Sequence, residues 1–177
     1  MKENTVLECL KTRRSVRAYL PDAVPKEKLD RILEAGLYAA SGMNRQGTII
    51  LLVTDRGLRD RLSRMNAAIM GREGTDPFYG APCVLAVLAD RTDPTGICDG
   101  SLVLGNMMNA AHAEGLGSCW IHRAAEEFDS DEGKAILREL GVKGDYVGVG
   151  HLIVGYSDGA EPEAKPRRDG RSASDGG

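Results

Sequence analysis

The segment from Ser101 to Glu114 limits the possible folds most strongly, because its apolar residues lie on nearly every face of a helix. A helix that is apolar all round is buried among other elements. We therefore expect a central helix, opened by Asp99 and ended by the turn Gly115-Leu116-Gly117, with the rest of the chain packed around it. The apolar residues are Leu102, Val103, Leu104, Met107, Met108, Ala110 and Ala111.

Apolar runs elsewhere predict the strands of a sheet. Continuous apolar runs lie at 48–54, 82–90 and 146–156, with a shorter one at 118–121. Runs of this length are typical of buried strands. Helical periodicity and capping residues predict helices at 4–12, from Pro25 to a terminator at Gly42, after Asp55, and from a capping box at Asp129 to Leu140. Because two helices precede the first strand, the order favours an α+β fold over a doubly wound one.

Length and charge exclude several classes of protein. The 177 residues suffice for one core but are short for two, so we expect a single domain over 1–167 and a flexible polar tail over 168–177. We expect no membrane span and no signal peptide, and therefore a cytoplasmic protein. The net charge of −3 argues against a nucleic-acid partner. The four cysteines lack metal-ligand spacing, which predicts no metal site and favours core positions for them.

Four polar segments could hold a ligand, and each also has a simpler interpretation. Arg13-Arg14-Ser15-Val16-Arg17 offers guanidinium forks that match phosphate oxygens, or is a solvated helix end. The loop 40–47 is rich in small hydrogen-bonding groups, as in a site or an ordinary turn. The segment 115–123 contains two glycines and Trp120, and could receive a flat ligand or form a compact turn with a core tryptophan. The basic run 165–168 could fold onto an anion or stay solvated.

Five motifs in one order resemble the nitroreductase family of FMN-dependent oxidoreductases. They are RRSVRAY at 13–19, SGMNRQ at 41–46, MNAAIMGREGTDPFYGAP at 65–82, GLGSCWIHRA at 115–124 and VGYSDGAEPEAKPR at 154–167. Each motif alone is weak, but together they extend the resemblance from about residue 5 to residue 168.

The resemblance implies an α+β sandwich of three layers, with a central, mostly antiparallel sheet flanked by helices. It implies an intertwined homodimer with two FMN molecules at the subunit interface. NADH or NADPH would donate hydride to flavin N5, and a nitroaromatic, a quinone or a similar small-molecule acceptor would then be reduced in a ping-pong mechanism. No catalytic residue is expected, because the cofactor carries the chemistry.

The same resemblance implies a role for each motif. Arg13, Arg14 and Ser15 would bind the FMN phosphate and ribityl chain, and Lys165 and Arg167 would close over the phosphate. Arg17 and Asn66 would lie at the pyrimidine edge of the flavin. Ser41, Gly42 and Asn44 would reach the FMN of the other subunit. The segment Trp120, Ile121, His122 and Arg123 would face the ring, with backbone amides toward N5 and O4.

Departures from the family pattern affect the substrate side more than the cofactor side. Gly47 and Thr48 stand where proline and an aromatic residue often follow, and His122 stands where many members have an acidic residue; His122 is our only candidate for a substrate contact. The chain is also shorter than typical members, which predicts an open pocket. Two alternatives are an FMN-holding regulatory dimer with little turnover and, more weakly, a polyanion binder that uses residues 13–17 and the basic tail.

Overall fold

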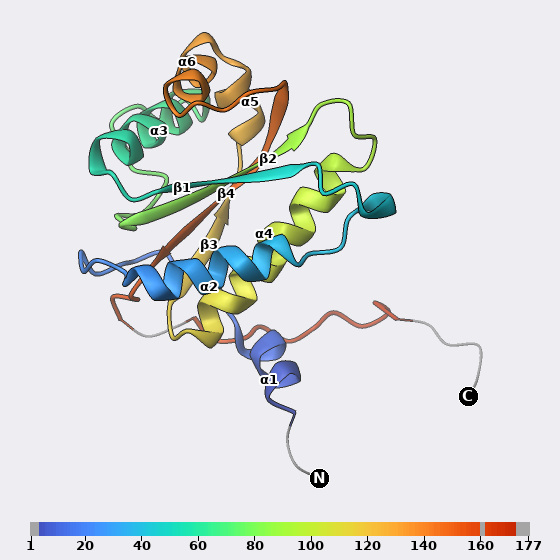
Figure 1. The fold of residues 1–177 in the computed structure, drawn as a ribbon. Coiled ribbons are helices and arrows are strands. Elements are labelled where there is room, and N and C mark those ends of the chain that lie inside the picture. Colours follow the sequence, from blue (N-terminus) through green and yellow to red (C-terminus); the bar gives the residue numbers. More distant parts are fainter. Residues whose placement is uncertain (1–3, 160–161, 173–177) are drawn as a thin grey trace.

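The computed structural model describes residues 4–159 and 162–172, and in these residues four strands form one sheet in the order β1-β2-β4-β3 (Figure 1). Each neighbouring pair of strands is antiparallel. The strands are β1 (Thr48–Val53), β2 (Cys83–Asp90), β3 (Gly117–Ile121) and β4 (Tyr146–Gly155). The end of the predicted tail, residues 173–177, lies outside the described residues.

Helices cover both faces of the sheet and make three layers. In Figure 1, α2 and α4 lie on one face, and α3, α5 and α6 lie on the other. Side chains of β2 alternate between these layers: Val84 packs toward α3, α5 and α6, and Leu85 packs toward α2 and α4. The α+β sandwich expected from the sequence is therefore confirmed. The helices are α1 (Thr5–Thr12), α2 (Lys26–Leu37), α3 (Arg56–Ile69), α4 (Gly96–Ala113), α5 (Ala124–Asp129) and α6 (Asp131–Glu139), with a 3-10 turn η1 (Gly42–Asn44).

The central helix α4 differs from the prediction in its start and in its burial. It begins at Gly96, so Asp99 lies in its first turn instead of opening it. Its middle is completely buried at Leu104 and Met107, where it packs on the sheet and on α2. Leu102 is nevertheless 50% exposed, so the expectation of burial on every side is wrong for a single chain. The reason is that α2 and the sheet together cover only part of the circumference of α4.

Local capping explains the other differences. The Asp55 carboxylate accepts a hydrogen bond from the backbone amide of Leu58 (2.8 Å) and caps α3 as predicted. The cap of α6 is Ser130, whose hydroxyl accepts from the amide of Gly133 (3.0 Å), because Asp129 already ends the separate short helix α5. α2 ends at Leu37, before the predicted terminator Gly42, which instead begins η1.

Two expectations about burial hold only in part. Strand β1 is half-buried along most of its length, because it lies at the edge of the sheet. Cys83 and Cys119 are buried in the core, and Cys9 is half-buried, but Cys98 is exposed on α4.

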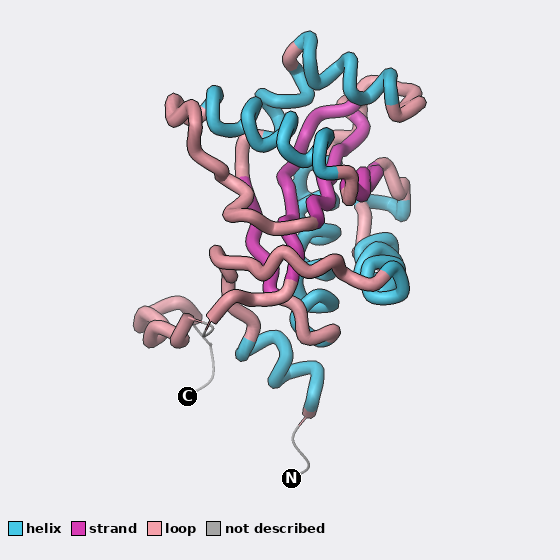
Figure 2. Tube along the Cα trace, turned by 90° about the vertical axis from the view of Figure 1, so that its left-hand side faces the viewer, coloured by secondary structure: helices cyan, strands magenta, loops and turns pink. Residues whose placement is uncertain are grey.

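Two terminal segments project from the same end of the molecule. Both Figures 1 and 2 show α1 and residues 162–172, here called the C-terminal arm, extending from the lower end of the body. No residue of α1 is buried. The helix is attached to the end of α4 through Thr12 Oγ1, which lies 2.9 Å from His112 Nε2.

Within the described ranges, no helix is both long and apolar enough to cross a membrane.

Candidate functional site

The basic segment 13–17 lies directly against the start of strand β3. Ser15 and Ser118 form a parallel bridge, and the amide of Val16 donates to the carbonyl of Ser118 (3.0 Å). Gly117 permits this approach, because a Cβ atom there would lie only 2.9 Å from the Val16 side chain. Two of the predicted ligand-binding segments, far apart in sequence, are thus neighbours.

Tyr19 holds this segment in place from the buried side. Its hydroxyl donates to the carbonyl of Val16 (2.8 Å), and its backbone pairs with Ser157 after β4. Burial raises the pKa of Tyr19 far above its ordinary value, and nearby Cys119 acts in the same direction. The hydroxyl therefore stays protonated and remains a donor at physiological pH.

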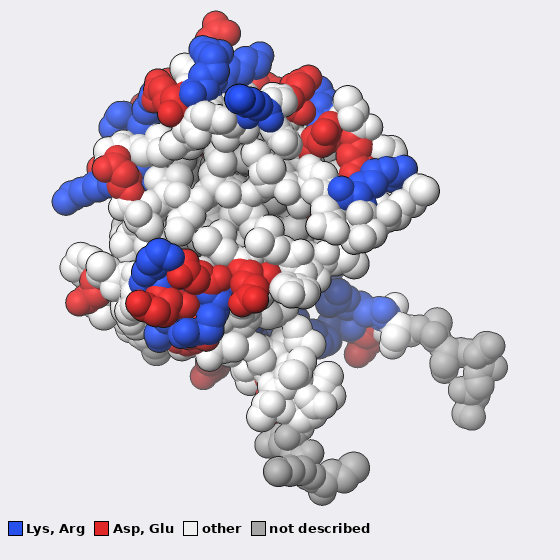
Figure 3. Space-filling view, in the orientation of Figure 1, with Lys and Arg blue, Asp and Glu red and all other residues white. Residues whose placement is uncertain are grey.

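A cationic hollow of about 590 Å³ lies between this segment and the C-terminal arm. Such a volume is in the usual range for small-molecule sites. Figure 3 shows Lys and Arg atoms gathered where the arm meets the body. Glu163 is the only carboxylate among the lining residues described, so the hollow favours an anion. The lining cations are Arg14, Arg17, Lys165, Arg167, Arg168 and Arg171.

A second hollow of about 300 Å³ adjoins the first, because Arg17 lines both. It contains the predicted segment at the end of β3, which consists of Trp120, Ile121, His122 and Arg123. Its other wall comes from the loop 71–81, including Arg72, Thr75 and Tyr79, to which the sequence assigned no role. The motif at 65–82 includes this loop, and the length of the loop and its glycines were further signals that could have identified it.

Asp76 fixes that loop. Burial alone would raise its pKa, but hydrogen bonds from Arg59, Ser63 and the backbone amides of Gly80 and Phe78 outweigh burial and lower the pKa. The two side-chain contacts are short, 2.6 Å from Arg59 and 2.6 Å from Ser63. The carboxylate is therefore ionised at neutral pH and holds one wall of the second hollow.

Three buried polar atoms of the predicted ligand-binding segments lack partners among the described residues. They are Arg13 Nη1, Ser118 Oγ and Trp120 Nε1. Buried polar groups are nearly always hydrogen-bonded, so these three atoms are unusual. Trp120 lines the second hollow, whereas Arg13 and Ser118 are not among the residues that line either hollow. The Trp120 ring also has a core role: it packs with the α4 layer, and a side chain at Gly150 would collide with it.

Asn66 lies behind the second hollow and does not line it. It is completely buried. Its amide nitrogen donates to the carbonyl of His122 (2.8 Å) and contacts Glu127, and its oxygen accepts from Arg123 Nε (2.8 Å). The amide expected at the flavin edge therefore makes its hydrogen bonds within the protein.

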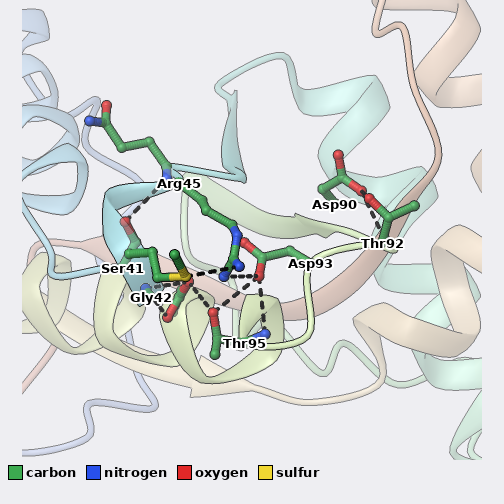
Figure 4. A network of polar contacts seen from close by, with 10 residues as sticks. Ser41, Gly42, Arg45, Asp90, Thr92, Asp93 and Thr95 are labelled. Atoms are coloured by element: carbon green, nitrogen blue, oxygen red, sulfur yellow. Dashed lines mark hydrogen bonds and ion pairs between the residues drawn. The ribbon is translucent and has the colours of Figure 1, made fainter.

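The loop around η1 is held at the start of α4 (Figure 4). The amide of Gly42 donates to both carboxylate oxygens of Asp99 (3.2 and 3.1 Å), and a side chain at Gly42 would collide with Thr95. Ser41 Oγ accepts from the amide of Gln46 (3.1 Å), and Asn44 Oδ1 accepts from the Gln46 side chain (3.1 Å).

One chain does not bring this loop to the basic segment. Gly42 is bonded at Asp99, whereas Thr12 contacts His112 at the far end of the same helix. These two positions on α4 are about 20 Å apart at 1.5 Å per residue. A ligand held at residues 13–15 would therefore have to extend over that distance to contact Ser41, Gly42 or Asn44 of the same chain.

In the part of the chain that the structure describes, no three His, Cys, Asp or Glu side chains are grouped so that they could hold a metal ion.

Comparison with known proteins identifies a family. The model of the nitroreductase family matches residues 10–156, which is most of the chain. A relative from Methanothermobacter thermautotrophicus, provisionally named NADH dehydrogenase/NAD(P)H nitroreductase, is 30% identical over 124 residues. This match covers 65% of the chain and 59% of that relative, which is less than two thirds of its length. A relative of the same name from Archaeoglobus fulgidus is 29% identical over 154 residues, with 84% of this chain and 85% of the relative covered.

A solved structure shows the same architecture. A nitroreductase with bound FMN from Bacteroides fragilis superimposes with a TM-score of 0.87 at 32% sequence identity. The superposition covers 97% of this chain and 98% of that one.

Proposed function

Because the chain belongs to the nitroreductase family, we propose that it is an FMN-dependent oxidoreductase that takes electrons from NADH or NADPH. The observation that carries the proposal is the pair of adjoining hollows that share Arg17, one cationic and one formed by the end of β3. Their sizes and linings fit a ligand with a phosphate at one end and a flat polar ring at the other. FMN supplies the redox chemistry when bound, accepting hydride at its ring and passing electrons to a second substrate.

The cationic hollow would hold the phosphate and the ribityl chain. Arg14 donates through Nη1 to the carbonyls of Lys11 and Arg13 (both 2.7 Å), which aligns its guanidinium at the wall of the hollow. Lys165 and Arg167 line the hollow from the arm. Arg13 precedes these wall residues in sequence and does not line the hollow; its buried Nη1 has no partner among the described residues, and we propose that it also donates to the phosphate. Charge-assisted hydrogen bonds to an anion are about twice as strong as neutral ones, so these residues would dominate affinity.

The second hollow would hold the ring. A fixed cation at Arg17 favours negative charge on the adjacent ring edge, which makes reduction easier. The backbone at Ile121, His122 and Arg123 would provide hydrogen-bond donors on the other side. His122 is exposed at the mouth, and we propose it as a substrate contact with no acid–base role assigned. A cytoplasmic location stays a prediction.

The second substrate would be a nitroaromatic, a quinone or a similar electron acceptor, used in a ping-pong sequence in which NAD(P)+ leaves first. Steady-state oxidation of NADH and NADPH should be measured with one quinone and one nitroaromatic at several fixed concentrations. Parallel double-reciprocal lines are expected. Intersecting lines would contradict the ping-pong sequence, and negligible turnover with every acceptor would favour an FMN-holding dimer.

We also propose that the protein acts as a homodimer. α1 exposes Val6, Leu7 and Leu10, and α4 exposes Ile97 and Leu102. Such apolar surface is typical of a protein interface. A second chain would cover it and could bring its own η1 loop to the ligand held by the first.

Mixing two defective chains tests that cross-subunit site. Arg13→Ala and Asn44→Ala homodimers should each bind FMN weakly. After unfolding and refolding together, random pairing should restore about a quarter of the sites to full affinity, since each heterodimer has one site with neither substitution. Sedimentation should give twice the chain mass of 19.0 kDa. Absence of any restored high-affinity sites in a mixture shown to contain heterodimers would contradict the proposal.

A further inference from the structure

Behind the second hollow, the ring-side hollow in which the flavin ring would lie, is a buried network of three polar side chains that the proposed function does not use. Asn66, Glu127 and His151 are all 0% exposed. Asn66 contacts one carboxylate oxygen of Glu127, and His151 Nε2 lies 3.1 Å from the other. The His151 ring is packed between Phe78 and Phe128, with centroid separations of 5.3 and 5.9 Å. The three residues come from α3, α5 and β4, so their hydrogen-bonded network joins three elements of the fold.

We propose that Asn66 is a positioning residue: supported by Glu127 and His151, it fixes the peptide between His122 and Arg123 so that its N–H faces the flavin. This inference rests on the proposed function, since it assigns an inner support to the ring site. It also replaces the direct flavin contact that the resemblance implied for Asn66.

The network permits only one orientation of the Asn66 amide. Its nitrogen has two acceptors, the His122 carbonyl and the Glu127 carboxylate, and its oxygen has one donor, Arg123 Nε. Rotating the amide by half a turn would set oxygen against two acceptors and nitrogen against a donor. An asparagine amide has two N–H donors and a carbonyl acceptor, so all these groups are used.

The orientation of one carbonyl then fixes the neighbouring amide. In a trans peptide, the carbonyl of one residue and the N–H of the next point in opposite directions. Since the His122 carbonyl points inward to Asn66, the N–H of Arg123 points away from Asn66. His122 and Arg123 both line the ring-side hollow. Among the described residues, no hydrogen bond from this amide is seen.

The backbone at Arg123 needs such support. Its φ of 79° is left-handed, a conformation that costs a residue with a side chain free energy unless its surroundings enforce it. The bond from Arg123 Nε to Asn66 holds the side chain on the same support as the preceding carbonyl. A buried Glu–His pair is weak as a source of stability, because burial of the charged groups costs free energy. The role of the pair is instead to support Asn66, which holds the peptide between His122 and Arg123.

The test compares FMN-loaded wild type with Asn66→Ala. We expect the FMN dissociation constant to rise about tenfold, which corresponds to 1.4 kcal/mol. The visible absorption maxima and midpoint potential of the bound flavin should also shift, because the amide that faces the ring is no longer held. Leu62→Val is the control: Leu62 is a core residue of the same helix that makes none of these hydrogen bonds. It should lower the thermal midpoint and leave the flavin spectrum and potential unchanged.

A second pair of variants distinguishes orientation from packing. Glu127→Gln keeps an oxygen that accepts from Asn66 and should keep wild-type affinity and spectrum, whereas Glu127→Leu removes the acceptor and should reproduce the shifts of Asn66→Ala. If Asn66→Ala does not fold, Asn66→Ser and this pair decide. Unchanged affinity, spectrum and potential in the Asn66 and Glu127→Leu variants would overturn the positioning role alone. A wild-type protein that binds no FMN would instead overturn the proposed function.

Discussion

Replacing Arg13 by alanine is expected to raise the FMN dissociation constant about 10- to 150-fold, a loss of about 1.5–3 kcal/mol. The physical reason is that Arg13 brings a guanidinium whose Nη1 is buried without a partner beside the segment that pairs with β3. An anion that accepts from this nitrogen removes the cost of an unpaired buried donor and gains a charge-assisted bond. Isothermal titration of the apoprotein with FMN measures the change.

The matched control is Arg56→Ala. Arg56 has the same charge but its side chain is 94% exposed, at the start of α3. Its removal changes the net charge equally and should leave FMN affinity close to wild type. Equal losses in the two variants would mean that overall charge determines binding. An unchanged dissociation constant in Arg13→Ala would remove Arg13 from the proposed phosphate site.

Gly148→Ala is expected to lower the free energy of unfolding by about 3 kcal/mol or more, at the upper end of what overpacking costs. A Cβ atom at Gly148 would collide with the backbone carbonyl of Ala124, where α5 begins. Backbone is less able to move aside than a flexible side chain, so α5 must shift. Because α5 follows Arg123 directly, FMN affinity should fall together with stability. Urea denaturation followed by FMN titration measures both.

Gly105→Ala gives the comparison for that substitution. Gly105 lies inside α4, and an added methyl group there would meet no atom within 4 Å in the chain. The change should raise the free energy of unfolding by about 0.5–1 kcal/mol, because alanine favours a helix interior over glycine. Similar destabilisation in both variants would show that the collision at Gly148 is relieved without cost.

Local signals in the sequence predicted much of the fold. The Asp55 cap and strand β2, which is buried except at its last residue, lie where the sequence placed them, because each depends on neighbouring residues in the chain. Sequence reasoning failed where two caps competed: Asp129 is a good cap by type, but Ser130 is the residue that faces α6. It also missed the exposure of Leu102, which depends on how much of α4 its neighbours cover.

The sequence predicted which segments form the candidate site, but it did not predict how those segments lie relative to one another. The pairing of Ser15 with Ser118 joins residues more than 100 positions apart, and only the folded chain shows it. Arg72 and Tyr79 lie in the motif at 65–82, but nothing in that motif shows that their loop forms a wall opposite the end of β3. Asn66 illustrates the limit most clearly. A motif identifies the residue, but its burial and partners determine whether it contacts a ligand or supports the backbone that does.

The most direct test of the account is anaerobic mixing of the FMN-loaded protein with NADH and, separately, with NADPH. We predict that the visible absorption of the oxidised flavin is lost with at least one donor, at a rate on the order of 10 s⁻¹. Addition of a quinone should restore it. A flavin that stays oxidised with both donors, although a chemical reductant bleaches it, would contradict the assignment as an NAD(P)H-dependent oxidoreductase.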